Sequence, residues 1–111
     1  EVSKETEKKI SQLQMLEQNI NSYVMQKQQL QQQLIEVESA LSELEETQEC
    51  YRIVGNVMIK ADKAKLQKEL KEKKEMFDLR LESIDKQQQK LKEKAAKSQK
   101  EIMAEIGNKN G

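Results

Sequence analysis

The first half of the chain carries a stripe of apolar residues with a regular spacing. From residue 13, ten positions follow at alternating intervals of three and four residues, and nine are apolar or aromatic: Leu13, Leu16, Ile20, Tyr23, Lys27, Leu30, Leu34, Val37, Leu41 and Leu44. This spacing, without Gly or Pro, is typical of the a and d positions of a coiled coil. A stripe this narrow must face another helix. The pattern predicts a helix over residues 4–47.

A second, thinner stripe occupies the last part of the chain. Asp62 is a suitable N-cap, and apolar residues then recur at helical spacing: Leu66, Leu70, Phe77, Leu81, Ile84, Leu91, Ala95, Ile102 and Ile106. Lys74, Gln88 and Ser98 fill the gaps in this series, so the stripe is more polar than the first. The pattern predicts a helix over residues 62–106, and Gly107-Asn108 predicts its end.

The segment between the stripes, residues 50–60, is rich in β-branched and apolar residues. Gly55-Asn56 at its centre suits a two-residue hairpin turn of type II′. That turn would pair Val54 with Val57, Ile53 with Met58, Arg52 with Ile59, and Tyr51 with Lys60. Both faces of the hairpin would be largely apolar, and an isolated hairpin is marginal in water. Either the hairpin joins strands of other chains in a shared sheet or barrel, or the segment is a hydrophobic loop that folds back on its own helices.

A connection this short returns the second helix alongside the first, antiparallel to it. The charges agree with this arrangement, because residues 1–48 carry 4 Lys and 9 Glu, whereas residues 62–111 carry 14 basic and 10 acidic residues. A parallel pair of first helices would instead bring like charges together. The predicted fold is mainly α, a long antiparallel two-helix coiled coil joined by a single β-hairpin, in one domain covering residues 1–111.

Composition excludes several classes of protein. Of 111 residues 36% are charged, with 20 basic and 20 acidic side chains, and aromatic residues are only 3%. The abundance of Lys, Glu, Gln, Leu and Ala, without Pro, favours long helices over disorder. No apolar run approaches the ~20 residues that span a bilayer, so no membrane association is expected. One Cys and no recognisable signal peptide predict a reducing, cytoplasmic location.

Catalytic and cofactor chemistry has little support. The chain has no His, so Cys50 lacks a His base, and no Gly-rich phosphate-binding loop surrounds Gly55. No enzyme activity, cofactor or metal site is therefore predicted. Six lysines between residues 86 and 100 suggest nucleic-acid binding. Interrupting Glu, zero net charge and the lack of interleaved aromatic residues favour a solvated helix face instead, and no nucleic-acid partner is predicted.

The order helix, Gly-Asn hairpin, helix resembles the β-type subunit of prefoldin. The most specific likeness is in residues 51–60, an aromatic-basic-apolar run followed by a Gly turn, an apolar triplet and a basic residue. Residues 26–30 resemble a stretch of the family's first helix, residues 68–73 resemble the start of its second, and residues 50–52 are similar to eukaryotic β-type relatives. The resemblance covers essentially the whole chain. A single hairpin supports the β type, since the α type carries two.

The resemblance implies a hexamer of two α-type and four β-type prefoldin subunits, so this chain would join α-type subunits and further β-type copies. Hairpins of this kind build paired β-barrels, for which the residues here would be Tyr51, Ile53, Val54, Val57, Met58 and Ile59. The coiled coils extend from the barrels, and their free ends hold unfolded client proteins without ATP and pass them to a group II chaperonin.

A chaperone of this kind needs accessible apolar side chains where the chain termini meet. The candidates there are Val2, Ile10, Leu13, Met15, Leu16, Ile102, Met103 and Ile106. Met suits promiscuous contacts because it is flexible and polarizable. The alternative for three of these candidates, Leu13, Leu16 and Ile102, is that they merely close the seam. The seam extends weakly upstream through Thr6 and Lys9, and Ile10 and Met15 lie just beside it. The alternative function is a structural coiled-coil dimerisation or scaffold module without client binding.

Overall fold

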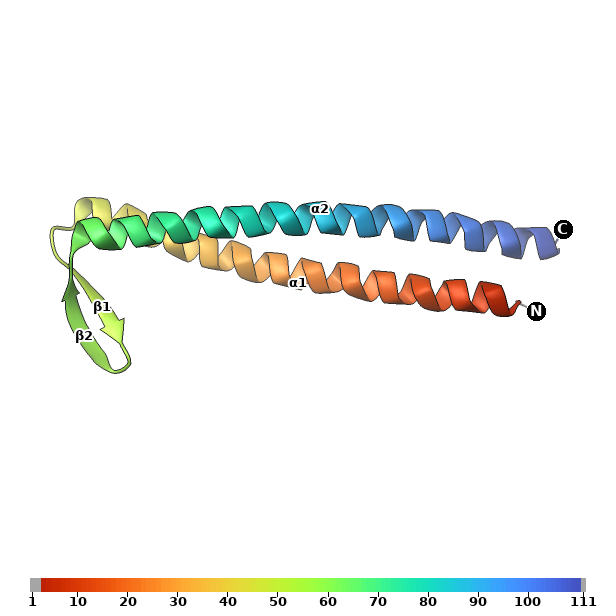
Figure 1. Ribbon diagram of the computed structural model, residues 1–111, viewed down its shortest axis with the longest axis horizontal. Coiled ribbons are helices and arrows are strands. Elements are labelled where there is room, and N and C mark those ends of the chain that lie inside the picture. The colour runs from red at the N-terminus through yellow and green to blue at the C-terminus, as the bar shows by residue number, and fades with distance from the viewer. Residues whose placement is uncertain (1–2, 111) are drawn as a thin grey trace. The chain divides into compact units, whose positions relative to one another are not determined.

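The computed structural model describes residues 3–110, with side chains described up to residue 107. The chain forms helix α1 (Lys4–Glu46), strands β1 (Cys50–Val54) and β2 (Val57–Ala61), and helix α2 (Lys63–Asn110) in that order (Figure 1). The predicted fold class, two long helices joined by one hairpin, is confirmed. None of the helices, over the residues that are described, has an apolar stretch long enough to cross a membrane.

The start of α1 is capped by Ser3. Its hydroxyl oxygen accepts a hydrogen bond from the backbone N–H of Thr6 at 3.1 Å, and its carbonyl accepts one from Glu7 N–H at 2.9 Å. These bonds satisfy backbone donors that a helix otherwise leaves without partners. Acidic residues in the first turn also suit the positive end of the helix dipole. At the other end, the Thr47 hydroxyl donates to the Glu43 carbonyl at 2.8 Å, and α1 ends at Glu46, one residue before the predicted boundary.

The start of α2 follows the prediction, whereas its end does not. Asp62 Oδ1 accepts hydrogen bonds from the backbone N–H groups of Ala64 at 2.9 Å and Lys65 at 3.4 Å, as expected for an N-cap. The predicted stop at Gly107 is wrong, because α2 continues to Asn110. A glycine ends a helix when it adopts a positive φ, and Gly55 is the only described residue that does so. In a helix interior, Gly costs only about 1 kcal/mol relative to Ala.

The predicted stripes form the seam between the helices. Every first-stripe residue from Leu13 to Leu44 is buried or half-buried, and Leu30, Val37 and Leu44 are among the most buried apolar residues of the described chain. The polar members of the second stripe, Lys74, Gln88 and Ser98, are also buried or half-buried. Whether a residue lies in the seam is therefore determined by its position in the helical repeat, and not by whether its side chain is apolar.

The last seam position of α2 differs from the prediction. Ile106 is 37% exposed, whereas its neighbour Glu105 is half-buried. The alternating spacing of three and four residues continues from Ser98 through Ile102 to residue 105, so helical phase selects the carboxylate.

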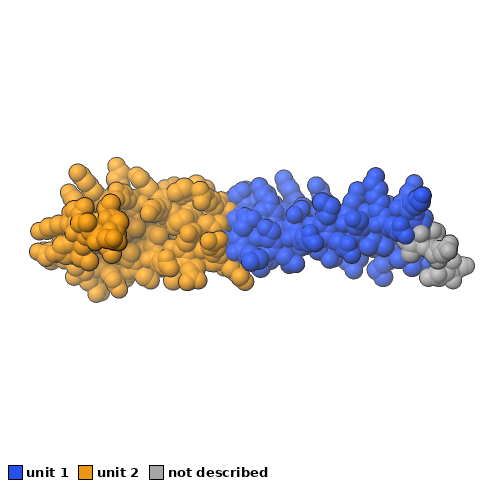
Figure 2. Space-filling model, turned by 90° about the horizontal axis from the view of Figure 1, so that it is seen from below, with its two compact units in different colours: residues 1–27, 83–111 blue, residues 28–82 orange. Residues whose placement is uncertain are grey.

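The chain divides into two compact units, residues 1–27 with 83–111 and residues 28–82 (Figure 2). In the first unit, Lys9 pairs with Glu101 and Lys27 pairs with Asp85. In the second, Lys74 pairs with Glu38. Higher numbers in α1 thus meet lower numbers in α2, as antiparallel packing requires. The hairpin belongs to the second unit.

The hairpin register is confirmed as predicted. Val54 faces Val57, Ile53 faces Met58, Arg52 faces Ile59 and Tyr51 faces Lys60, and Cys50 opposite Ala61 extends the ladder. Gly55 has φ 61°, whereas Asn56 does not have a positive φ. This combination fits a type II′ turn, in which only the first central residue needs a positive φ.

Candidate functional site

The hairpin carries the largest group of exposed apolar side chains in the second unit. All the residues predicted for assembly are at least half exposed, from Ile59 at 50% to Ile53 at 71%: Tyr51, Ile53, Val54, Val57, Met58 and Ile59. They lie on both faces of the two-stranded sheet, because paired residues share a face and successive residues alternate. The sheet contains only β1 and β2, so the outer edge of each strand has no partner within the described chain.

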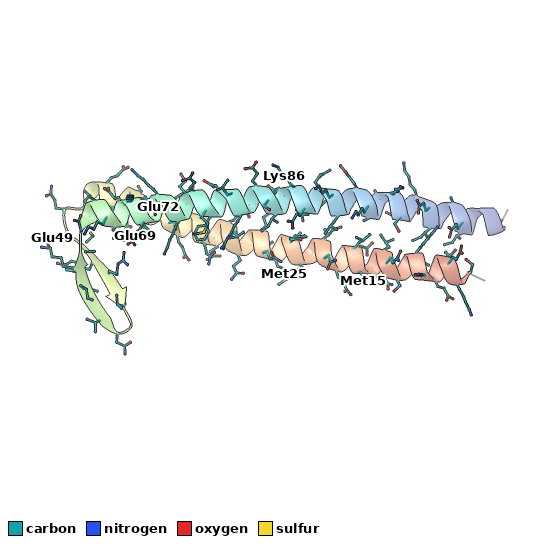
Figure 3. The ribbon with its side chains drawn as sticks, in the orientation of Figure 1. Met15, Met25, Glu49, Glu69, Glu72 and Lys86 are labelled. Carbon is teal, nitrogen blue, oxygen red and sulfur yellow. The ribbon has the colours of Figure 1, made fainter. Side chains whose placement is uncertain are left out.

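The base of the hairpin is more buried than its turn. Cys50 is 9% exposed, and its thiol donates a hydrogen bond to the Ala61 carbonyl at 3.3 Å. The Arg52 guanidinium donates to the carboxylate of Glu69, which lies on α2 near the hairpin (Figure 3). Such an exposed ion pair contributes little stability. It does tie the hairpin face that carries Arg52 and Ile59 to α2.

The predicted client-binding residues differ widely in exposure. Ile102 is buried at 7%, Leu13 and Leu16 are half-buried in the seam, and Ile10 is half-buried beside it. Three others are exposed, namely Met15 at 62%, Met103 at 66% and Ile106 at 37%. Val2 lies outside the described residues. The structure thus separates the candidates into seam residues and residues open to solvent.

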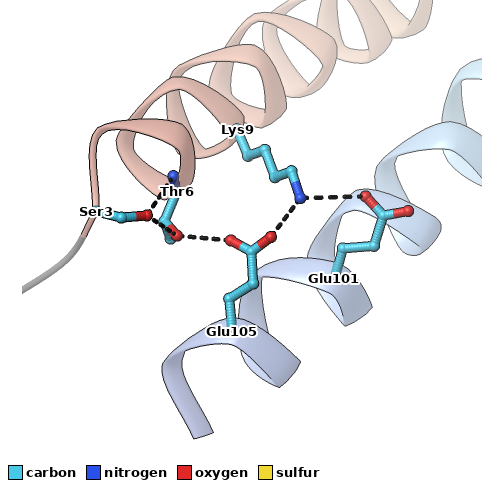
Figure 4. A network of polar contacts seen from close by, with 5 residues as sticks. All are labelled: Ser3, Thr6, Lys9, Glu101 and Glu105. Atoms are coloured by element: carbon cyan, nitrogen blue, oxygen red, sulfur yellow. Dashed lines mark hydrogen bonds and ion pairs between the residues drawn. The ribbon is translucent and has the colours of Figure 1, made fainter. Parts of the chain in front are cut away.

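Polar side chains link the two helices near the termini (Figure 4). This end network consists of Ser3, Thr6, Lys9, Glu101 and Glu105. The Thr6 hydroxyl donates to Glu105 Oε2 at 2.6 Å and lies 2.8 Å from the Ser3 hydroxyl. Since the single Thr6 proton goes to Glu105, Ser3 supplies the proton of the second bond. These bonds explain how Thr6 can be only 2% exposed.

Lys9 supplies the positive charge of the end network. Its ammonium donates to Glu105 Oε1 and lies 4.0 Å from Glu101 Oε2. The hydrogen bond to Glu105 raises the pKa of Lys9 above its ordinary 10.5, reinforced by the charges of Glu105, Glu101 and Glu5 and opposed by partial burial. Because the folded pKa is raised, the contribution of Lys9 to stability is complete below its ordinary pKa. It is lost only as pH rises through the raised value.

A second polar group interrupts the seam in its middle. The Tyr23 hydroxyl donates to Gln87 Oε1 at 2.6 Å, and Lys27 Nζ lies 2.6 Å from Asp85 Oδ1. Gln88 is only 6% exposed. Polar residues at seam positions specify the register of a coiled coil at some cost in stability. This group therefore indicates a role in alignment.

Sequence reasoning missed a set of exposed apolar residues on the outer helix faces. These are Val24, Met25, Ile35, Met76 and Leu79, whose exposure ranges from 37% to 70%. Met15 and Met25 lie on the side of α1 that faces away from α2 (Figure 3). With Met58 and Met103, all five methionines of the chain are exposed. The signal that could have found them is an apolar residue outside the stripe.

Metal ligation finds no support in the described residues, among which no three Cys, Asp or Glu side chains are grouped as a metal site requires. Carboxylates are numerous there, but the ones with cross-helix partners pair with lysines.

Comparison with known proteins bears on these surfaces. A family model described as prefoldin subunit matches residues 7–109. The chain belongs to the prefoldin subunit family. The prefoldin subunit beta of Archaeoglobus fulgidus is 34% identical over 96 residues, which cover 84% of this chain and 83% of the relative. That of Thermococcus onnurineus is 40% identical over 88 residues, 77% and 76% of the two chains.

The structural comparison agrees. The crystal structure of the prefoldin beta subunit from Thermococcus strain KS-1 has a TM-score of 0.86 to this chain at 32% identity, and covers 94% of each chain. The predicted resemblance to the β type of prefoldin is therefore confirmed. As a member of this family, the chain is a chaperone subunit with a helical coiled-coil architecture.

Proposed function

We propose that this chain is a β-type subunit of a hexameric, ATP-independent prefoldin, and that it joins α-type subunits and further β-type copies through its hairpin. The observation that supports this proposal most directly is the exposure of six apolar side chains on both faces of a sheet whose two outer edges are unpaired in the described chain. Monomeric proteins rarely leave such surfaces uncovered. Strands from neighbouring subunits would supply the missing edges and cover both faces.

The size of the uncovered surface supports stable assembly. Full burial of a large aliphatic side chain contributes roughly 1.5–3 kcal/mol. Ile53, Met58 and Val57 are each at least 60% exposed, so most of that contribution is still available from each. Paired edges would add backbone hydrogen bonds that β1 and β2 cannot make with each other.

We further propose that unfolded client proteins bind where the termini meet, and that a group II chaperonin receives them. The exposed Met15 and Met103 support client binding, because flexible thioether side chains adapt to varied apolar partners. Both long helices are continuous through residues 27 and 82, where the two units divide, which supports one functional domain. The free thiol of Cys50 supports a reducing, cytoplasmic location.

The assembly proposal is tested by placing a charge in the hairpin. Ile53→Asp puts an unpaired carboxylate opposite Met58 in an apolar sheet interface, which costs several kcal/mol. Ile59→Asp puts a carboxylate opposite Arg52 and removes an apolar side chain from the interface. Light scattering after size-exclusion chromatography with an α-type subunit should show a species of about six subunits for the unaltered chain. We expect both variants to lose it.

Ile35→Asp is the matched control. Ile35 is 63% exposed on α1, so the same chemical change is made at similar exposure but away from the hairpin. It should assemble like the unaltered chain. A stable dimer that ignores the α-type subunit would favour a structural coiled coil and contradict the proposal. So would undiminished assembly of both hairpin variants.

A further inference from the structure

The outer face of α1 carries a symmetric series of residues. Residues seven apart lie on the same face of a coiled-coil helix, and the positions opposite the seam read the same in both directions, apart from opposite charges at the two ends. Met25 is the centre of this series and, like Met15, lies on the side of α1 that faces away from α2 (Figure 3). We call the series the outer row, and all its members are exposed: Lys4, Ser11, Gln18, Met25, Gln32, Ser39 and Glu46.

A row with this symmetry is complementary to a second copy of itself in the antiparallel orientation. If Met25 lies against Met25 of the second copy, each outer residue meets the one equally far from Met25 on the other side. Lys4 then lies opposite Glu46, and Gln18 lies opposite Gln32. A two-fold axis repeats each contact, as in an isologous dimer. A parallel pairing would instead place Lys4 against Lys4 and Glu46 against Glu46.

The residues beside the outer row agree with the antiparallel orientation. Met15, which is 62% exposed, would lie opposite Ile35, which is 63% exposed. Two such apolar contacts would flank the central one between the methionines. Glu7 would lie opposite Glu43, and Lys8, the residue after Glu7, offsets the repulsion between these two carboxylates. The apolar contacts are therefore central, and the charges lie toward the ends.

The middle of this face has the character of an interface. From Gln18 to Ile35 the only charged residue is Lys27, which pairs with Asp85 across the seam, although 36% of the whole chain is charged. Charged residues are depleted in the centres of protein interfaces, and neutral Gln side chains both donate and accept hydrogen bonds. A shallow groove lies where Met15 of the second copy would reach, and is lined by Gln28, Gln31, Gln32, Ile35 and Glu36.

We infer that the outer row of α1 is a contact surface for a second copy of this chain, which binds antiparallel with Met25 at the two-fold axis. The hairpin follows the C-terminal end of α1, so the two hairpins of such a pair lie at opposite ends, roughly 65 Å apart for a helix of 43 residues. Chains whose hairpins share one barrel cannot make this contact with each other. The contact therefore joins chains of different hexamers, which goes beyond the proposed function.

Single cysteines test the register of this contact. The background is the full chain with Ile53→Asp, which weakens any association through the hairpin. A short bismaleimide should cross-link Met25→Cys to itself, because two copies of this residue meet at the axis. Gln32→Cys should not cross-link to itself, but should cross-link when it is mixed with Gln18→Cys. The background chain, whose only thiol is the buried Cys50, should remain uncross-linked in denaturing electrophoresis.

A charge at the axis tests the same contact without a cross-linker. In the same background, Met25→Lys brings two ammonium groups together, and should raise the dimer dissociation constant in sedimentation velocity by about tenfold or more. Met76→Lys is the matched control, because it makes the same change at an exposed methionine of α2. It should leave that constant unchanged.

Three results would overturn the inference. They are self-cross-linking of Gln32→Cys, which would indicate a parallel pair, no cross-link in Met25→Cys, and equal effects of Met25→Lys and Met76→Lys. None of these measurements requires an α-type subunit, so their failure is distinguishable from a failure of hexamer assembly. Ile35→Asp separates the two proposals further, because it should weaken the contact between copies while the hexamer still assembles.

Discussion

At the scale of single residues, polar side chains within the seam distinguish its parts. The middle of the seam contains Tyr23, Lys27 and Gln88, and its end contains Thr6 and Glu105. A hydrophobic residue at any of these positions would pack better against a helix. Their polar character therefore reduces stability, and their partners define which residues of the two helices lie opposite each other.

Lys27 provides the residue-scale prediction. Lys27→Leu should stabilise the chain by about 1 kcal/mol, because the new side chain fills an a position and Asp85 remains half exposed to water. The midpoint of urea unfolding should therefore rise. Asp85→Asn removes the ion pair without filling the seam. It should leave the midpoint of urea unfolding unchanged or lower it. A lower midpoint for Lys27→Leu would show that the ion pair outweighs seam packing.

At the scale of elements, two glycines have opposite roles. Gly55 forms the hairpin turn with φ 61°, a conformation in which other residues are strained. Gly107 lies inside α2 without a positive φ. An added Cβ would meet no atom within 4 Å at either position. The backbone conformation alone therefore decides what a substitution does.

The same substitution at these positions should act in opposite directions. Gly55→Ala should destabilise the hairpin by about 1 kcal/mol, and lower the thermal midpoint of the assembled hexamer. Gly107→Ala should strengthen the end of α2 by up to about 1 kcal/mol, and slow amide exchange there. Equal effects of the two substitutions would mean that Gly107 does not lie within a helix in solution.

The elements were predictable because their signals are local. Alternating intervals of three and four residues identify the seam, and Gly55-Asn56 identifies both the turn and the register of the hairpin. The errors arise where residue type and geometry disagree. The apolar side chain of Ile106 predicts a seam residue, although helical phase selects Glu105. The glycine at position 107 predicts the end of a helix, although a glycine ends a helix only where its φ is positive.

The functional surfaces were less predictable than the fold. Thr6 is polar, and nothing in its local sequence indicates that Glu105, which is 99 residues away, makes its burial possible. The outer residues Met25 and Ile35 lie outside the apolar stripes, so a search for stripes does not identify them. Long-range polar partners and off-stripe apolar residues become visible only once the two helices are aligned.

At the scale of the whole molecule, both compact units are built from the same two helices. Each of the two long helices passes without interruption from one compact unit into the other. The end network belongs to the first unit and the hairpin to the second. Because both units share the same two helices, unfolding of the helical segments in one unit destabilises the helical segments in the other.

This continuity predicts one cooperative unfolding transition. Circular dichroism at 222 nm should show a single thermal midpoint, and amide exchange should give the same opening free energy for residues 13–27 and for residues 28–44, since both segments belong to one helix. Two separated midpoints would show that residues 1–27 with 83–111 unfold as a domain of their own.

The placement of the methionines has a chemical consequence. All five are exposed on the hairpin, on the outer helix faces or near the termini, while Leu, Ile and Val make up most of the seam. Peroxide converts an accessible methionine to its sulfoxide, which is polar, and reductases reverse the change. Oxidation would therefore alter the surfaces of this chain while its seam stayed chemically intact, so that a damaged subunit keeps its fold until it is repaired.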